Sequence, residues 1–514
     1  MTTARAHERI LMIALDAAEP ELIERWMDEG RLPNLARLRD SGTYGRLAST
    51  ADWLAGSIWP TFHSGTLPGD HALYHFVQWH RGRGTHLRPA CEWLPQRVFW
   101  REAAHQGRRV IALDLPALFA PEPINGIEIT GWCNTDLLAA PGAFPPGTLE
   151  WARRRFGHSL MPAEVYAPQN LRALLRLRDD LIRWTHRTRD LSLALMDRED
   201  WDLFLLCLTA THRGGHKLWD STGTPGVPTN HHADRLAGAL PSVYEACDEA
   251  VGRLLSAAGP VTALVFSLHG MGPNTSRIVL LPQMLERILN DKPSSSRSFG
   301  LLQRARSWVP ASWRNQFKGR LPTRFQDRLT SFWREGHLDL RKTRAFPLVS
   351  DLQGYIRINL RGREPGGIVE PGTQYDQLCE EISSGLRSFV DSETGTSVVD
   401  EVARSDQLYP GEARTSDLPD LIVRWSTFPA SEHRALVSPL HGWIDWPTPG
   451  RHPEGRNGNH RREGFLLAAG EGIGRDVPLD GAHIVDLAPT VFSLLGLSPL
   501  PGWTGEVLQI GSRP

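Results

Sequence analysis

The sequence lacks the features that mark secreted or membrane-spanning proteins. Its five cysteines are scattered, odd in number and without Cys-x-x-Cys spacing, which argues against a disulfide framework and predicts reduced thiols. The longest apolar runs, such as Leu203 to Leu208, are far too short to cross a membrane. The N-terminus from Met1 to Arg9 is polar and does not have the pattern of a signal peptide. We therefore expect a cytoplasmic protein without a membrane span.

The sequence also lacks a large net charge of either sign. The 57 Lys and Arg residues balance 58 Asp and Glu residues, so no strong field draws the protein toward nucleic acid, and we do not expect a nucleic-acid partner. One local exception is the segment 291–345, with 13 Lys or Arg against 4 Asp or Glu and several aromatic residues. We interpret it as a basic, partly helical insertion or cap. A surface that contacts an anionic substrate, a partner or nucleic acid is the alternative.

Short apolar runs alternate with amphipathic stretches along most of the chain. This alternation predicts an α/β fold with a mostly parallel central sheet and helices on both faces, in a body formed by residues 1–290 and 346–514. The expected strands are Arg9–Leu15, Val110–Asp114, Leu203–Leu208, Val261–Phe266, Asp420–Trp425 and Gly464–Ala469. The expected helices are Glu19–Glu29, Pro33–Arg39, Leu171–Met196, His232–Ala257, Tyr375–Val390 and Val485–Leu495.

Histidine is plentiful, with 20 residues, and four of them lie next to predicted strands. His212 and His216 follow one strand and are four residues apart, so they share a face if that segment is helical. His269 follows another strand, and His460 precedes a third. Asp16 ends the first strand, and ligands bind at the carboxyl ends of strands in open α/β sheets. A lone histidine after a strand is usually a loop residue, but this set predicts a metal site.

A second candidate group is the segment 55–65. Gly56 permits a tight turn, and Ser57 could cap the short helix that follows. A hydroxyl at a helix N-terminus beside a metal ion is well placed to act as a nucleophile, because the ion lowers the pKa of the hydroxyl. The alternative is that Ser57 is an ordinary capping residue.

A set of short motifs extends over nearly the whole chain apart from the basic insertion. They are Ile10–Asp16, Leu32–Leu35, Trp59–Phe62 with Ser64–Gly65, Pro68–His71, Thr211–Trp219, Ser267–Gly272, Gly354–Leu360, Gly362–Val369, Leu418–Val423, Asn459–His460 and Val485–Thr490 with Leu494–Gly496. In combination these motifs resemble the type I phosphodiesterase/nucleotide pyrophosphatase family of the alkaline phosphatase superfamily. The resemblance implies a three-layer, alkaline-phosphatase-like fold with an inserted cap.

The resemblance also implies roles for the candidate residues. Asp16 and His269 correspond to ligands of one metal ion, and His216 and His460 to ligands of a second. The family has aspartate where this chain has His212, and imidazole can replace carboxylate on zinc. We expect one Zn²⁺ ion and consider a second, with Mn²⁺ or iron as alternatives.

Two further departures from the family pattern concern catalysis. Leu268 replaces an aspartate ligand, and Ala55 stands where the family places its nucleophile. Ser57 is the nearest hydroxyl and is our candidate nucleophile, with Thr61 as a weaker one.

The residues and the resemblance together predict a metal-dependent hydrolase of phosphate esters, of the phosphodiesterase or phosphatase type, with a sulfatase as a variant. Its substrate would be a small-molecule phosphate or sulfate ester. Leu268 and Ala55 motivate a second hypothesis, a non-catalytic protein that binds an anion or a nucleotide on the same fold. A phosphoryl transferase is the third hypothesis.

Overall fold

The computed structural model describes residues 9–94, 97–134, 137–158, 169–219, 236–289, 339–448, 450 and 452–511. Its largest element is an eight-stranded sheet in the order β2-β19-β9-β1-β8-β5-β6-β7. The five consecutive strands from β9 to β6 are parallel, while β19 and β7 run antiparallel to their neighbours. The strands are β1 (Ile10–Leu15), β2 (Thr43–Leu47), β5 (Val110–Leu113), β6 (Gly126–Thr130), β7 (Gly142–Phe144), β8 (Leu203–Leu208), β9 (Thr262–Ser267) and β19 (Gly464–Ala469).

The central strands are buried on both faces, as parallel strands covered by helices are. All six residues of β1 are buried, and those of β8, β9 and β19 are too. Alternate residues of β1 belong to different hydrophobic clusters: Leu11 and Ile13 to one, Ile10 and Met12 to the other. The prediction of a mostly parallel sheet is therefore confirmed, and five of the six predicted strands lie in it, with bounds within one residue of the observed ones.

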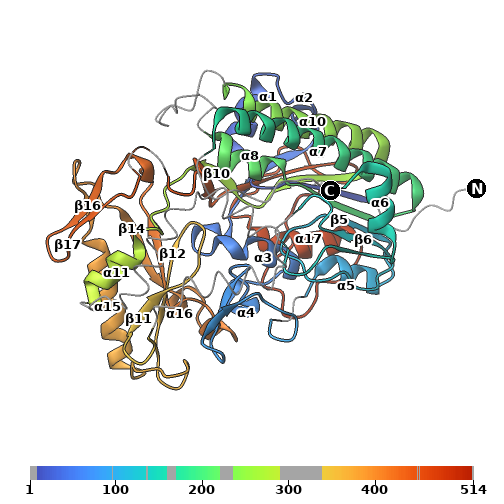
Figure 1. Cartoon of the computed structure of the whole chain (residues 1–514). Helices are drawn as coiled ribbons and strands as arrows, with labels where there is room; N and C mark the ends of the chain where they lie inside the picture. The colour runs from blue at the N-terminus through green and yellow to red at the C-terminus, as the bar shows by residue number, and fades with distance from the viewer. Residues whose placement is uncertain are drawn as a thin grey trace, which may run out of the picture.

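Helices cover both faces of the sheet, which makes three layers (Figure 1). The two layers differ in helix length: the first includes two long helices of 28 and 20 residues, whereas the helices of the second have seven or eight residues. The first layer contains α1 (Pro20–Asp28), α2 (Pro33–Ser41), α7 (Leu171–Arg198), α8 (Ala210–Leu218) and α10 (Ala239–Ala258). The second contains α3 (Ile58–Ser64), α5 (Phe99–His105) and α17 (Leu487–Leu494).

A second lobe is inserted between two short paired strands, β10 (Gly270–Pro273) and β18 (Gly458–Arg461). It lies to one side of the three layers in Figure 1 and has its own hydrophobic cluster. Its sheets have the orders β11-β12-β15-β14 and β13-β16-β17, and every pairing in them is antiparallel. The elements are β11 (Ala345–Pro347), β12 (Gly354–Ile358), β13 (Val390–Asp391), β14 (Val399–Arg404), β15 (Leu421–Trp425), β16 (Ala435–Ser438), β17 (Gly442–Asp445), α11 (Leu281–Leu289), α15 (Thr373–Arg387) and α16 (Ser405–Leu408).

The strand predicted at Asp420–Trp425 exists as β15, but the prediction that it belongs to the parallel sheet was wrong. It pairs with β12 and β14 in the second lobe, because its apolar side chains pack in the cluster of that lobe. Most of the basic segment 291–345 lies outside the described residues, so the division into body and insertion stays a prediction.

The remaining described elements are short. No helix among the described residues is long and apolar enough to cross a membrane. The short elements are β3 (Gln78–His80), β4 (Thr85–Leu87), α4 (Pro68–His71), α6 (Thr148–Phe156) and the 3₁₀ turns η1 (Thr50–Asp52), η2 (Ala55–Ser57), η4 (Thr415–Asp417), η5 (Ala430–Glu432) and η6 (Ile484–Asp486).

Candidate metal centre

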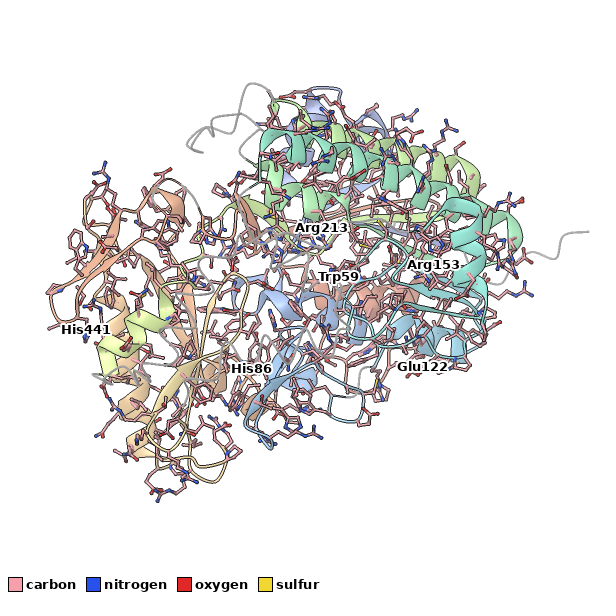
Figure 2. The ribbon with its side chains drawn as sticks, viewed as in Figure 1. Trp59, His86, Glu122, Arg153, Arg213 and His441 are labelled. Atoms are coloured by element: carbon pink, nitrogen blue, oxygen red, sulfur yellow. The ribbon has the colours of Figure 1, made fainter. Side chains whose placement is uncertain are left out.

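The carboxyl ends of three parallel strands meet at one edge of the sheet. Strand β1 lies between β8 and β9, so the residues that follow these strands are neighbours. Asp16 follows β1, α8 follows β8, and His269 lies two residues beyond the end of β9. Figure 2 labels Trp59 on α3 and Arg213 on α8, the two helices that supply side chains to this edge. The topology therefore brings the predicted residues together although they are far apart in the sequence.

Helix α8 and strand β18 supply three histidines that face one another, and we call His212, His216 and His460 the histidine triad. His212 Nε2 lies 2.9 Å from His460 Nε2 and 3.0 Å from His216 Nε2. One ligand atom from each ring lies within 4.8 Å of the others. His212 and His216 share a face of α8, as their spacing predicted.

In two of the triad rings, the hydrogen-bond partner of Nδ1 shows which ring nitrogen carries the proton. His216 Nδ1 lies 2.9 Å from the carbonyl oxygen of Gly458, which can only accept, so this nitrogen is the donor. His212 Nδ1 lies 2.9 Å from Asp16 Oδ2 and donates to that carboxylate. In the neutral rings both Nε2 atoms then carry lone pairs, and these lone pairs face each other at 3.0 Å. A bound cation would relieve this repulsion.

Burial favours the protonation states that bind metal. It lowers the pKa of His216 and of His460 well below the ordinary histidine value, and the nearby charge of Arg456 contributes in the same direction. Burial raises the pKa of Asp16, but the charge and hydrogen bond of His212 outweigh it and leave this pKa below its usual value. At neutral pH His216 and His460 are therefore neutral and Asp16 is ionised, which are the ligand forms of these groups.

The triad fits a divalent ion of the zinc type. Zinc binds imidazole nitrogen at about 2.0–2.1 Å, and tetrahedral geometry then separates the nitrogens by roughly 3.3 Å. The rings would need to move apart by only a few tenths of an ångström from the contacts described above. Three imidazoles are also a known catalytic zinc environment, and two of the three here have an outer hydrogen-bond acceptor.

The predicted second set, Asp16 and His269, lies next to the triad. The ring of His269 packs edge-on against His460 with centroids 4.6 Å apart. Both of its ring nitrogens are buried and have no hydrogen-bond partner among the described residues. Burial lowers its pKa to about 4, so the ring is neutral. Leu268, beside it, is buried in the hydrophobic cluster under the sheet and offers no ligand atom.

The candidate nucleophile Ser57 is the last residue of η2 and is fully buried. Its hydroxyl donates to the carbonyl of Leu54 at 2.6 Å and lies 2.9 Å from the hydroxyl of Thr50. It occupies the capping position of α3, as predicted, but its side chain makes no capping bond. Thr61, the weaker candidate, is buried and hydrogen-bonds His71 at 3.1 Å. In the described part of the chain neither hydroxyl forms a hydrogen bond with Asp16 or the triad.

Three further residues near the triad were not predicted. Arg456 is buried, and its guanidinium lies 3.7 Å from Asp351, which also pairs with His75 at 3.3 Å. Burial raises the pKa of Asp351, but His75 and Arg456 outweigh it and lower this pKa. Arg456 stands four residues before His460 in a Gly- and Asn-rich loop, a signal that could have indicated it. Asp351 and His75 carry no comparable signal in the sequence.

Comparison with known proteins identifies the family and the fold of the chain. The sequence matches the family described as type I phosphodiesterase/nucleotide pyrophosphatase over residues 10–427. No curated protein matches it. The structure is similar to phosphonoacetate hydrolase from Sinorhizobium meliloti 1021 in complex with phosphonoformate, with a TM-score of 0.53, 12% identity and coverage of 97% of this chain and 98% of the other. The same enzyme in complex with phosphonoacetate gives a TM-score of 0.51 and 14% identity, with the same coverage. The predicted three-layer fold is confirmed by this similarity.

Proposed function

The chain belongs to the type I phosphodiesterase/nucleotide pyrophosphatase family, and from this premise we propose that it is a metal-dependent hydrolase of small-molecule phosphate esters. The observation that carries the proposal is the convergence of the three Nε2 atoms of the histidine triad. Buried lone pairs that face one another are unfavourable without a cation between them.

Each residue of the site has a proposed task. His212, His216 and His460 hold the ion, for which the nitrogen ligand set favours Zn²⁺ over Mn²⁺ or iron. Asp16 and the carbonyl of Gly458 fix the orientation of two of these rings. When bound, the ion supplies positive charge that polarises a phosphoryl oxygen and lowers the pKa of a nearby hydroxyl. Arg456, buried beside the triad, adds a fixed positive charge that favours an anionic substrate.

Ser57 is the proposed nucleophile. Its hydroxyl donates to the carbonyl of Leu54, so attack on a substrate requires the side chain to rotate away from that carbonyl. The turn η1, which holds Thr50 beside Ser57, packs against β18, the strand that carries His460. Ser57 and the triad therefore belong to adjoining parts of the molecule. The phosphonates in the two similar structures suggest a small anionic phosphoryl compound as substrate.

The proposal is tested by measuring metal content and turnover of the same purified protein. We expect about one zinc ion per chain by elemental mass spectrometry, and chelator-sensitive hydrolysis of bis-p-nitrophenyl phosphate or p-nitrophenyl phosphate. The relative rates on the diester, the monoester and p-nitrophenyl sulfate would identify the ester class. A protein without metal and without turnover would contradict the proposal.

The nucleophile is tested with Ser57→Ala and with Ala55→Ser. Loss of the hydroxyl should abolish most turnover while metal content stays unchanged. Ser192→Ala is a matched control, because Ser192 is also buried and donates to a backbone carbonyl, that of Thr188 at 2.8 Å, but lies in α7. If Ala55→Ser raises the rate and Ser57→Ala has no effect, position 55 rather than Ser57 is the place for the attacking group.

Leu268 and Ala55 favour a second candidate, a binding protein without turnover on the same fold. It would bind phosphate or a nucleotide with an affinity that depends on Arg456, and would hydrolyse none of the three esters. Multiple turnover of any ester, removed by His216→Ala, would exclude this candidate.

A further inference from the structure

Asp16 is held by two side-chain donors from different helices. Its Oδ1 accepts from Trp59 Nε1 at 3.1 Å, and its Oδ2 accepts from His212 Nδ1 at 2.9 Å. Its backbone carbonyl accepts from the hydroxyl of Thr211 at 2.6 Å. The carboxylate is buried, and its orientation is set by these contacts. Both oxygens are therefore engaged in fixing side chains of the site.

The bond from His212 gives Asp16 a specific relation to the triad. A histidine that binds metal through one nitrogen commonly donates its other N–H to a carboxylate or a carbonyl, which fixes the tautomer and the ring. His212 has this arrangement with Asp16, and His216 has it with Gly458. The two α8 histidines are thus each oriented by a different acceptor, and Asp16 is the acceptor for His212.

Among the described residues, the place for a second ion has too few ligands, and only the histidine triad forms a group that could hold one. Zinc sites use three or four protein ligands, and beside the triad only Asp16 and His269 remain from the predicted second set. Leu268 is 1% exposed, and its side chain belongs to the hydrophobic cluster of the second helical layer. An ion bound there would lie next to the apolar side chain of Leu268. It would also compete with His212 Nδ1 for the carboxylate of Asp16.

We propose that this chain binds one metal ion rather than two, and that Asp16 is a positioning residue that orients His212 for that ion. The inference rests on the proposed function, because it concerns the same site. A leucine at position 268 is consistent with a site for one ion, because no second ion then requires a ligand there. His269 stays beside the triad as a neutral imidazole that does not form half of a second site.

The first test is the stoichiometry of the wild-type protein. After zinc loading and dialysis, elemental mass spectrometry should give one ion per chain, and titration with Co²⁺ should show one set of visible absorption bands. Two ions per chain with turnover would overturn the inference and leave the proposed function intact. No ion and no turnover would instead overturn the proposed function.

The second test separates a positioning residue from a ligand. Asp16→Asn should keep one ion per chain, weaken its affinity by roughly 10- to 100-fold in competition with a chelating dye, and shift the Co²⁺ bands. Glu19→Gln is the matched control, because Glu19 is also a buried carboxylate close in sequence but accepts from the backbone N–H of Met271. Unchanged affinity in Asp16→Asn would overturn the role of Asp16.

The third test restores the missing ligand. Leu268→Asp should raise the stoichiometry toward two ions, and the double variant with Asp16→Asn should return it to one. A buried aspartate could unfold the protein, so circular dichroism must first show a native melting transition. If Leu268→Asp does not fold, the wild-type stoichiometry and the Asp16→Asn affinity still decide the inference.

Discussion

At the scale of single residues, the second lobe contains a buried charged group that is separate from the metal centre. His433 donates from Nδ1 to Asp391 at 2.7 Å, and its Nε2 accepts from the guanidinium of Arg277 at 2.7 and 2.9 Å. All three side chains are buried. His433 therefore connects the strand that carries Asp391 with the segment that leaves β10, and it can do so only as a neutral ring.

Acid should weaken this group. Burial and the charge of Arg277 lower the pKa of His433 in the folded protein. Below about pH 6.5 the histidine is therefore protonated more readily in the unfolded chain, and the free energy of unfolding decreases as the pH is lowered. Burial raises the pKa of Asp391, but hydrogen bonds from His433 and Thr394 outweigh it and hold it at about 2, so its contribution is lost from about pH 3.8 downward. Denaturant unfolding should show the loss from His433 as a lower free energy of unfolding at pH 5.5 than at pH 7.5.

The variant His433→Ala gives the magnitude at neutral pH. It leaves a buried guanidinium and a buried carboxylate without their common partner, which should cost about 3 kcal/mol of unfolding free energy. The difference between pH 7.5 and pH 5.5 should then shrink relative to the wild type. An unchanged pH dependence would show that other groups cause it.

A prediction about the binding of an anionic substrate concerns Arg456. Its buried charge lies near the triad, and a charged hydrogen bond to an anion contributes about 1.5–3 kcal/mol. We expect Arg456→Ala to raise KM for the best phosphate ester by roughly tenfold to 100-fold, with a smaller change in kcat. Arg456→Lys should recover part of the loss because it keeps the charge. A melting temperature like that of the wild type would exclude a purely structural cause.

The site residues show what a sequence can and cannot indicate. Asp16, His212, His216, His269 and His460 could be predicted because each stands beside an apolar strand run, and parallel strands place their ends together. Asp351 and His75 could not, since they lie in irregular segments whose position depends on the second lobe. The contact between Asp16 and His212 also needed the structure, because spacing does not show which acceptor a ring nitrogen meets.

At the scale of elements, the metal centre depends on the close approach of α8 and β18. Gly458 allows it, because a Cβ there would lie 2.2 Å from the backbone oxygen of Gly215 and 3.0 Å from the Cβ of Trp219. The carbonyl of Gly458 also holds His216. A side chain at this position would therefore separate two elements that carry the triad.

Gly458→Ala should disturb metal binding through the backbone. We expect overpacking to cost about 1–3 kcal/mol of stability. The displaced carbonyl should also weaken metal affinity by roughly tenfold, as loss of an outer hydrogen-bond partner does. Gly82→Ala is the control, because the nearest neighbour of an added Cβ there is the side-chain ring of His80 at 3.3 Å. Equal metal affinity in the two variants would contradict the role given to this contact.

The elements were predictable to different degrees. Strands β1, β5, β8, β9 and β19 follow from their apolar runs, and their observed bounds differ by at most one residue from the predicted ones. The assignment of β15 failed because an apolar run reports burial and does not report which sheet buries it. The helix predicted at Tyr375–Val390 ends at Arg387 instead, because Val390 belongs to strand β13 and pairs with β16.

At the scale of the whole molecule, the triad joins segments that are distant in the chain. His212 and His460 are 248 residues apart, and the second lobe lies between them. A ligand that binds only the folded state stabilises it by about 2.7 kcal/mol at 100 times its Kd. The ion should therefore stabilise the body as a whole and not only α8.

Metal removal should be visible in thermal unfolding. We expect saturating Zn²⁺ to raise Tm of the chelator-treated protein by roughly 3–6 °C. His460→Ala lacks one of the three ligands and should show little or no increase, which separates the specific site from non-specific zinc binding. The same increase in both proteins would place the stabilising ion elsewhere.

The short ribbon of β10 and β18 has a consequence for synthesis of the protein. The ribosome delivers His212 and His216 first, then the second lobe, and His460 only afterwards. At about 5–20 residues per second, the gap of 248 residues lasts roughly 12–50 s. During that time the nascent chain has two of its three imidazole ligands and cannot complete the centre. If the chain binds metal as proposed, capture of the ion is therefore a late event, after the strand that returns from the second lobe has joined the body.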